Sequence, residues 1–145
     1  MTPRARWILP GIALLAAAGL AVSSLSLVHH YGRDPTSYCD LGASFNCDIV
    51  NRSTYSSVMG IPVALIGILG YLGLFGLATV YRTRAETPLL LLTGSVAGLG
   101  FALYLTYIEK FVLATWCILC LSSLAAIAAI AILSLALVVR DRPRA

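Results

Sequence analysis

The chain has 145 residues, of which 59% are hydrophobic and 11% are charged, and its formal net charge is +4. This composition, with a mean hydropathy of +0.91, excludes an ordinary soluble domain and indicates an integral membrane protein. The basic excess is explained by membrane topology, so it does not indicate a nucleic-acid partner.

Four stretches without charge follow one another along the chain, at residues 7–28, 61–81, 89–108 and 117–139. Each is about 20 residues long, enough to cross a hydrocarbon core of roughly 30 Å. The longest polar segment, 29–60, is too short for a second domain. The sequence therefore predicts an all-α membrane protein, in which residues 1–145 form a single bundle of four transmembrane helices with a long loop between the first two.

The first span follows Arg4 and Arg6 and resembles a secretory signal, but its apolar run exceeds the usual signal core of about 7–15 residues, so we expect an uncleaved anchor.

Of the ten Lys and Arg residues, seven fall at the two termini and in the connection 82–88, and three fall on the other side. The positive-inside rule then predicts a multi-pass protein of the cell membrane with both termini cytoplasmic. All four cysteines lie on the opposite, oxidising side, where disulfides persist.

The first connection carries Cys39 and Cys47 in a polar segment with a turn signal at Gly42. Residues 47–59 fit one or two short helical turns on the membrane surface. The second span is predicted to start at Gly60–Pro62, with Pro62 in the first turn, where its missing N–H has no cost.

The short connection "YRTRAETP" makes the second and third spans antiparallel neighbours. Glycines recur in both spans, and because small residues let helices approach closely in lipid, we interpret them as packing residues. They are Gly67, Gly70, Gly73 and Gly76 in the second span and Gly94, Gly98 and Gly100 in the third. Glu109 and Lys110 are expected to flank the third span at its non-cytoplasmic end, with Lys110 reaching the headgroups.

A Cys-x-x-Cys pair, Cys117 and Cys120, opens the fourth span. With a helix start near Trp116 and Thr115 as its N-cap, the two sulfurs lie on one face and close enough to bridge. Cys117 would then lie in the first turn, where backbone N–H groups and the helix dipole stabilise a thiolate that faces water. Cys120 would lie one turn deeper and face a reactant inside the bundle.

The cysteines have other interpretations. One is that the Cys-x-x-Cys is a chance pair of small apolar residues, and another is that Cys39 and Cys47 form a structural disulfide. A four-cysteine zinc site does not fit the spacing between Cys39 and Cys47, so no metal is expected, and Leu121 stands where a haem-attachment motif needs histidine. Two pairs on one side favour a relay of thiol–disulfide exchange.

Such a relay needs a final two-electron acceptor that reaches the deeper pair through lipid, and a membrane quinone has both properties. The polar candidates for contacts to its oxygens are Ser56, Ser57, Ser122 and Ser123, although helix capping or back-bonding also accounts for them. Met59 and Leu124 complete the predicted surroundings of the quinone.

The segments "YCDLGASFNCDIVNRS", "SSVMGIPVALIGILGY" and "WCILCL" resemble the bacterial form of the vitamin K epoxide reductase family. The resemblance covers the chain from about Tyr38 to Leu121. It implies a four-helix bundle around a quinone, either menaquinone or ubiquinone. By the same resemblance Cys117 and Cys120 form the redox centre, with Cys120 beside the quinone, while Cys47 attacks Cys117 and Cys39 exchanges with a partner protein.

Two positions depart from the vertebrate pattern. Ser56 stands where an asparagine contacts the quinone, and Leu124 stands where a tyrosine does so. Both changes favour quinone reduction coupled to disulfide formation over vitamin K epoxide reduction. Many bacterial relatives carry a fused thioredoxin-like domain, and none is expected here, so a separate periplasmic or extracellular thioredoxin-fold protein is the expected dithiol donor. The rival hypothesis is a non-catalytic membrane subunit with static disulfides.

Overall fold

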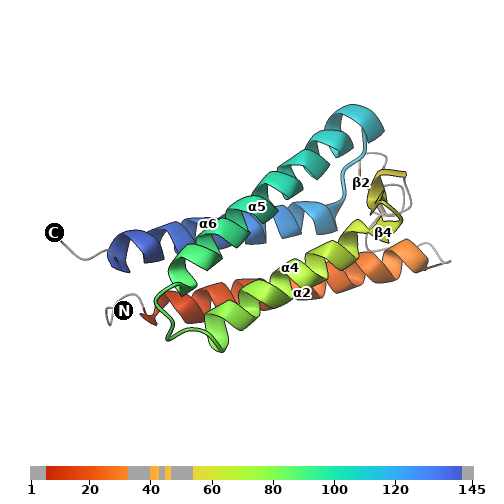
Figure 1. Cartoon of the computed structure of the whole chain (residues 1–145). Coiled ribbons are helices and arrows are strands. Elements are labelled where there is room, and N and C mark those ends of the chain that lie inside the picture. Colours follow the sequence, from red (N-terminus) through yellow and green to blue (C-terminus); the bar gives the residue numbers. More distant parts are fainter. Residues whose placement is uncertain (1–5, 33–39, 43–44, 47–53, 142–145) are drawn as a thin grey trace.

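Four long helices make up most of the protein (Figure 1). In the computed structural model, the described residues are 6–32, 40–42, 45–46 and 54–141. The helices are α2 (Ile8–Tyr31), α4 (Val63–Thr79), α5 (Thr87–Ile108) and α6 (Ile118–Asp141). They correspond one to one with the four predicted spans, although the bounds differ.

Three of these helical segments are long and apolar enough to cross a membrane: Ile8–Tyr31, Thr87–Leu113 and Ile118–Asp141. The second of them joins α5 to a short π-helix, η2 (Glu109–Leu113). Helix α4 has 17 residues, which is the lower limit for a span. The chain is therefore an all-α membrane protein, and a fourth crossing by α4 remains a prediction.

The helices pack unevenly around the core. Helix α2 packs along both α4 and α6, and α5 packs along α6, whereas α4 and α5 touch much less. In Figure 1, α5 diverges from α4 towards the end of the bundle that carries the β-strands. The main core lies nearer the other end and is formed by Leu9, Ile12, Ala16, Tyr71, Leu74, Ala78, Leu91, Ile127, Ile130 and Leu137.

The first connection contains two small hairpins that the sequence did not predict. Strand β1 (Asp40–Gly42) pairs antiparallel with β2 (Phe45–Asn46). Strand β3 (Ser57–Val58) pairs antiparallel with β4 (Ile61–Pro62). A single 3-10 turn, η1 (Thr54–Ser56), precedes the second hairpin and matches the helical turn predicted within 47–59, of which residues 47–53 lie outside the described residues.

The predicted start of the second span is wrong by two residues. Met59 and Gly60 both have positive φ, 53° and 83°, as a two-residue hairpin turn requires. This turn pairs Ile61 and Pro62 with β3, so Pro62 is the N-cap of α4 rather than a residue of its first turn.

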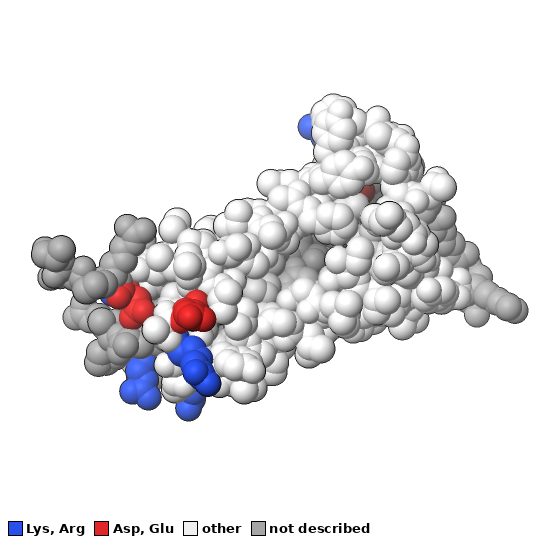
Figure 2. All heavy atoms as spheres, viewed as in Figure 1, with Lys and Arg blue, Asp and Glu red and all other residues white. Residues whose placement is uncertain are grey.

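Charged side chains gather at the end of the bundle where both chain termini lie, and the middle is almost free of them (Figure 2). Hydroxyl groups on the apolar surface are satisfied within their own helices, because Ser24, Thr79, Thr93, Thr106 and Ser122 each donate to the carbonyl four residues earlier. Both features suit a surface in contact with lipid, which offers no hydrogen-bond partners.

Candidate functional site

The Cys-x-x-Cys lies where the chain turns back into the bundle. Helix α6 begins at Ile118, and the carbonyl of Cys117 accepts the N–H of Leu121 at 3.0 Å. Cys117 is therefore at the N-cap position, and the prediction that it lies in the first helical turn is wrong. Thr115 is not the cap, because its hydroxyl donates to the carbonyl of Leu113 at 3.2 Å.

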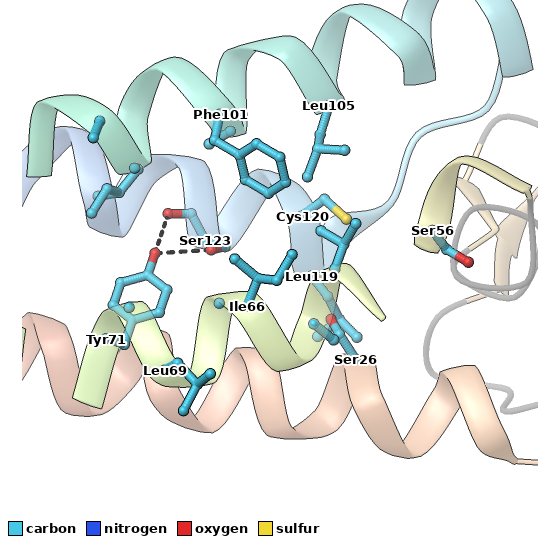
Figure 3. A pocket seen from close by; sticks show the side chains of 18 of the residues that line it. Ser26, Ser56, Ile66, Leu69, Tyr71, Phe101, Leu105, Leu119, Cys120 and Ser123 are labelled. Atoms are coloured by element: carbon cyan, nitrogen blue, oxygen red, sulfur yellow. Dashed lines mark hydrogen bonds between the residues drawn. The ribbon is translucent and has the colours of Figure 1, made fainter. Parts of the chain in front are cut away.

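The two sulfurs have different surroundings. The side chain of Cys117 is 0% exposed and packs in a small apolar cluster with Leu119, Val22 and Leu113. The water-facing position predicted for Cys117 is therefore not observed. Cys120 is half-buried and lines a cavity among the helices (Figure 3), and its facing a reactant there stays a prediction.

The cavity beside Cys120 has a volume of about 530 Å³. Helices α4, α5 and α6 supply most of its walls, which are chiefly apolar, including Ile66, Leu69, Phe101, Leu105, Leu119 and Ile127. A volume in the range of ligand pockets, with an apolar lining and few polar groups, fits a flat lipid-soluble ring.

Glycines create this space. Gly67, Gly70 and Gly73 of α4 and Gly94 and Gly98 of α5 all line the cavity. Gly67 does lie against α2, where a Cβ would come within 2.8 Å of Ser23 Oγ, as predicted for a packing residue. Gly70 and Gly73 have no such neighbour within 4 Å, so their predicted packing role is wrong and their absent side chains leave the cavity open.

Polar groups stand at two levels of the cavity. At the level of the hairpins, Ser56 Oγ lies 3.3 Å from Nδ1 of His30, and both residues line the cavity. Deeper in the bundle, the hydroxyl of Tyr71 lies 2.8 Å from both the carbonyl and the hydroxyl oxygen of Ser123 (Figure 3). These groups place hydrogen-bonding side chains in a cavity whose lining is chiefly apolar.

A buried carboxyl completes the site, and the sequence analysis placed it wrongly. Glu109 was expected to flank the third span, but its side chain is 1% exposed and lines the cavity. Its Oε2 accepts the backbone N–H of Cys117 at 3.2 Å, and its carboxyl is also a hydrogen-bond partner of the Cys120 side chain. Lys110 is exposed, as expected, with its ammonium 5.2 Å from the centre of the Phe111 ring.

The position of Glu109 comes from an irregular turn. Residue 109 opens the π-helix η2, and its carbonyl accepts the N–H groups of Ala114 and, at 3.1 Å, of Thr115. Ala114 then adopts a left-handed conformation, with φ 50°, and ends the helix. The wide turn and the left-handed residue bring Cys117 back against Glu109. Single π-turns inside helices are frequent at functional sites.

The remaining predicted residues divide into three groups. Ser56 and Ser123 line the cavity, whereas Ser57, Met59, Ser122 and Leu124 do not. Met59 is 97% exposed at the tip of its hairpin. Cys39 and Cys47 lie outside the described residues. Neither His30 nor Tyr71 was among the candidate site residues predicted from the sequence, although Tyr71 ends the family segment "SSVMGIPVALIGILGY".

Within the described part of the chain, no three His, Cys, Asp or Glu side chains gather where they could hold a metal ion. A membrane helix bundle with a Cys-x-x-Cys, one of whose sulfurs lines an apolar cavity, has the features of a membrane thiol oxidoreductase with a lipid-soluble acceptor. The vitamin K epoxide reductase family model matches residues 10–135, and the chain belongs to this family. The resemblance drawn from the cysteine motifs is thus confirmed, and the protein is in general terms a quinone-linked thiol oxidoreductase.

Proposed function

We propose that this protein oxidises the dithiol of a separate thioredoxin-fold protein and passes the electrons to a membrane quinone, either menaquinone or ubiquinone. The observation that carries the proposal is the position of Cys120, whose side chain lines an apolar cavity of about 530 Å³ among the helices. A sulfur in this position meets a lipid-soluble acceptor without leaving the bundle.

The terminal step balances without other reactants. Cys117 and Cys120 lose two electrons and two protons and form a disulfide, and the quinone takes up both electrons and both protons and leaves as quinol. Cys120 faces the quinone, and Cys117 closes the disulfide from the N-cap of the same helix. Three residues of spacing at a helix start leave the two sulfurs on one face, within bridging reach.

The earlier steps of the relay run through the first connection. We place Cys39 as the residue that exchanges with the partner and Cys47 as the residue that attacks Cys117. The pairing of Asp40 with Asn46 across the first hairpin supports a working pair, because these residues adjoin the two cysteines in sequence. Transfer of the electrons between pairs proceeds by thiolate attack through a mixed disulfide.

Ser56, His30, Tyr71 and Ser123 would orient the quinone, since they form the hydrogen-bonded polar pairs at the two levels of the cavity. Ser57, Met59 and Leu124 have no part in this proposed site. The charged end of the bundle, which holds both termini, would face the cytoplasm, and the hairpin end would face the oxidising side.

Partner-driven turnover in lipid tests the function. The protein is purified in lipid with added menaquinone or ubiquinone, and a reduced thioredoxin-fold dithiol donor is supplied while the quinone absorbance is followed. We expect the quinone to bleach with wild type and not with Cys120→Ser, and turnover that persists in this variant would contradict the proposal. Thiol-trapping mass spectrometry checks the relay, because interchanging Cys39–Cys47 and Cys47–Cys117 forms support it, whereas two fixed bridges support a static protein.

A further inference from the structure

The proposed step requires two protons to cross from sulfur to quinone oxygen inside a cavity lined mostly by hydrocarbon. The two thiols supply as many protons as the quinol takes up, so the step needs a carrier for protons and no outside source. Among the described residues that line the cavity, Glu109 contributes the one carboxyl group. A carboxyl group can both accept a proton from a thiol and give it to an oxygen.

The contacts of Glu109 place it at the sulfurs. Its carboxyl bonds the backbone N–H of Cys117 through Oε2 at 3.2 Å and has the Cys120 side chain as a second partner. Its other oxygen, Oε1, is buried and has no hydrogen-bond partner among the described residues. A buried acceptor without a partner has a cost of about 1–3 kcal/mol, so its retention calls for an explanation.

The irregular backbone around Glu109 is a second, independent indication that this residue is functional. The π-turn at 109–113 and the left-handed Ala114 interrupt the helix where Glu109 turns inward. A left-handed conformation has a cost of about 1–2 kcal/mol for a residue other than glycine. Without the extra residue of the π-turn, the positions after Glu109 would rotate, and the chain would not return Cys117 to the carboxyl.

We propose that Glu109 is a catalytic residue that carries the protons of the Cys117–Cys120 dithiol to the quinone oxygen in the adjoining cavity. This inference rests on the proposed function. Glu109 as carboxylate takes a proton from Cys120, whose sulfur forms a bond to a carbon of the quinone ring, and as carboxylic acid it donates that proton to a quinone oxygen. Again a carboxylate, it takes the proton of Cys117 as that sulfur attacks Cys120. The S–S bond forms, the S–C bond breaks with its electron pair left on the ring, and Glu109 gives the second proton to the quinol. Two electrons and two protons leave the dithiol and both arrive on the quinone.

The test separates proton transfer from mere positioning. Glu109→Gln keeps the length of the side chain and an oxygen for the N–H of Cys117, but it cannot carry a proton. Glu109→Asp keeps the ionisable group and shortens its reach. Glu86→Gln makes the same chemical change at the opposite end of α5, where the side chain is exposed, and is the matched control.

Single-turnover quinone reduction by the fully reduced protein in lipid is then measured for all four proteins. Loss of a general acid–base group slows a step by about 10²–10⁴-fold, so we expect Glu109→Gln to fall by at least about 100-fold. Glu109→Asp should retain clearly more activity than Glu109→Gln, and Glu86→Gln should match wild type. The thermal unfolding midpoint of Glu109→Gln should match that of wild type, because its amide oxygen can still accept the N–H of Cys117.

Other results overturn the inference. If Glu109→Gln reduces quinone within about threefold of wild type, or retains as much activity as Glu109→Asp, the carboxyl does not carry protons. If Glu109→Gln loses quinone reduction together with its thermal stability, the residue acts only in the fold. If wild type and Glu86→Gln both fail to reduce quinone while Cys120 is a thiol, the proposed function itself is refuted, and the inference with it.

Discussion

Gly19 of α2 lies directly beneath the Tyr71 ring, and adding a single methyl group there tests how the deep end of the cavity is held. A Cβ at Gly19 would overlap the ring of Tyr71, whereas a Cβ at Gly11 of the same helix would lie 3.8 Å from Leu133 Cδ1, an ordinary contact. Gly19→Ala must therefore displace the ring and break the contacts of its hydroxyl with Ser123. Gly11→Ala is the matched control.

The expected loss follows from those contacts. Overpacking costs about 1–3 kcal/mol, and the lost hydrogen bond adds about 0.5–1.5 kcal/mol. The gain in helix propensity from glycine to alanine is shared by both variants and cancels in the comparison. We therefore expect Gly19→Ala to be less stable than Gly11→Ala by about 1.5–4.5 kcal/mol.

Equilibrium unfolding in mixed detergent micelles measures this difference. In a Tyr71→Leu background, which removes the ring, the two alanine variants should agree within about 0.5 kcal/mol. The reasoning is refuted if Gly19→Ala and Gly11→Ala are equally stable in the wild-type background, or if the gap between them persists without the ring.

Three further predictions concern the cavity and its rim. Gly70→Leu should fill the cavity and raise the KM for quinone at least about tenfold, which corresponds to a loss of about 1.4 kcal/mol of binding free energy. Gly76→Leu is the control, because Gly76 is equally unobstructed on α4 but lies outside the cavity, and its KM should not change. Equal KM values for the two variants would contradict the assigned quinone site. Ser56→Ala removes the contact with His30, so the free energy of unfolding should fall by about 0.5–1.5 kcal/mol. Steady-state kinetics should show that kcat/KM for quinone falls by less than tenfold. An unchanged free energy of unfolding would show that the contact contributes nothing to stability. Met59→Gly places glycine at a position with positive φ and should stabilise the protein by about 0.5–1 kcal/mol without changing the KM for quinone. A raised KM would show that Met59 contributes to quinone binding after all.

The sequence predicted the features that depend on apolar length and on motif spacing. The four apolar runs predicted the four helices, and the cysteine motifs indicated the family. The same spacing predicts a reactant beside Cys120, and in the structure Cys120 lines the cavity. These signals are local, because a span is defined by consecutive apolar residues and a Cys-x-x-Cys by its own helix.

The rest of the site depends on how separate segments meet. From the sequence, Glu109 is expected to be a charged residue that flanks the third span. In the structure the π-turn directs its side chain inward, and no local pattern in the sequence predicts that turn. The sequence around Tyr71 does not indicate a polar role. In the structure its hydroxyl is hydrogen-bonded to Ser123, which lies 52 positions away in the chain. The one available signal was Glu109 itself, since an acidic residue next to an apolar span is costly to bury and is usually functional.

The most direct test of the account is the stoichiometry of a single turnover. The reduced protein is mixed with a quinone in lipid, the quinol formed is measured by absorbance, and the cysteines are trapped and mapped at the same time points. We expect one quinol for each Cys117–Cys120 disulfide, with none formed by Cys120→Ser. Quinol that appears without this disulfide, or at an unchanged rate in Cys120→Ser, would contradict the assignment of Cys120 as the sulfur that meets the quinone.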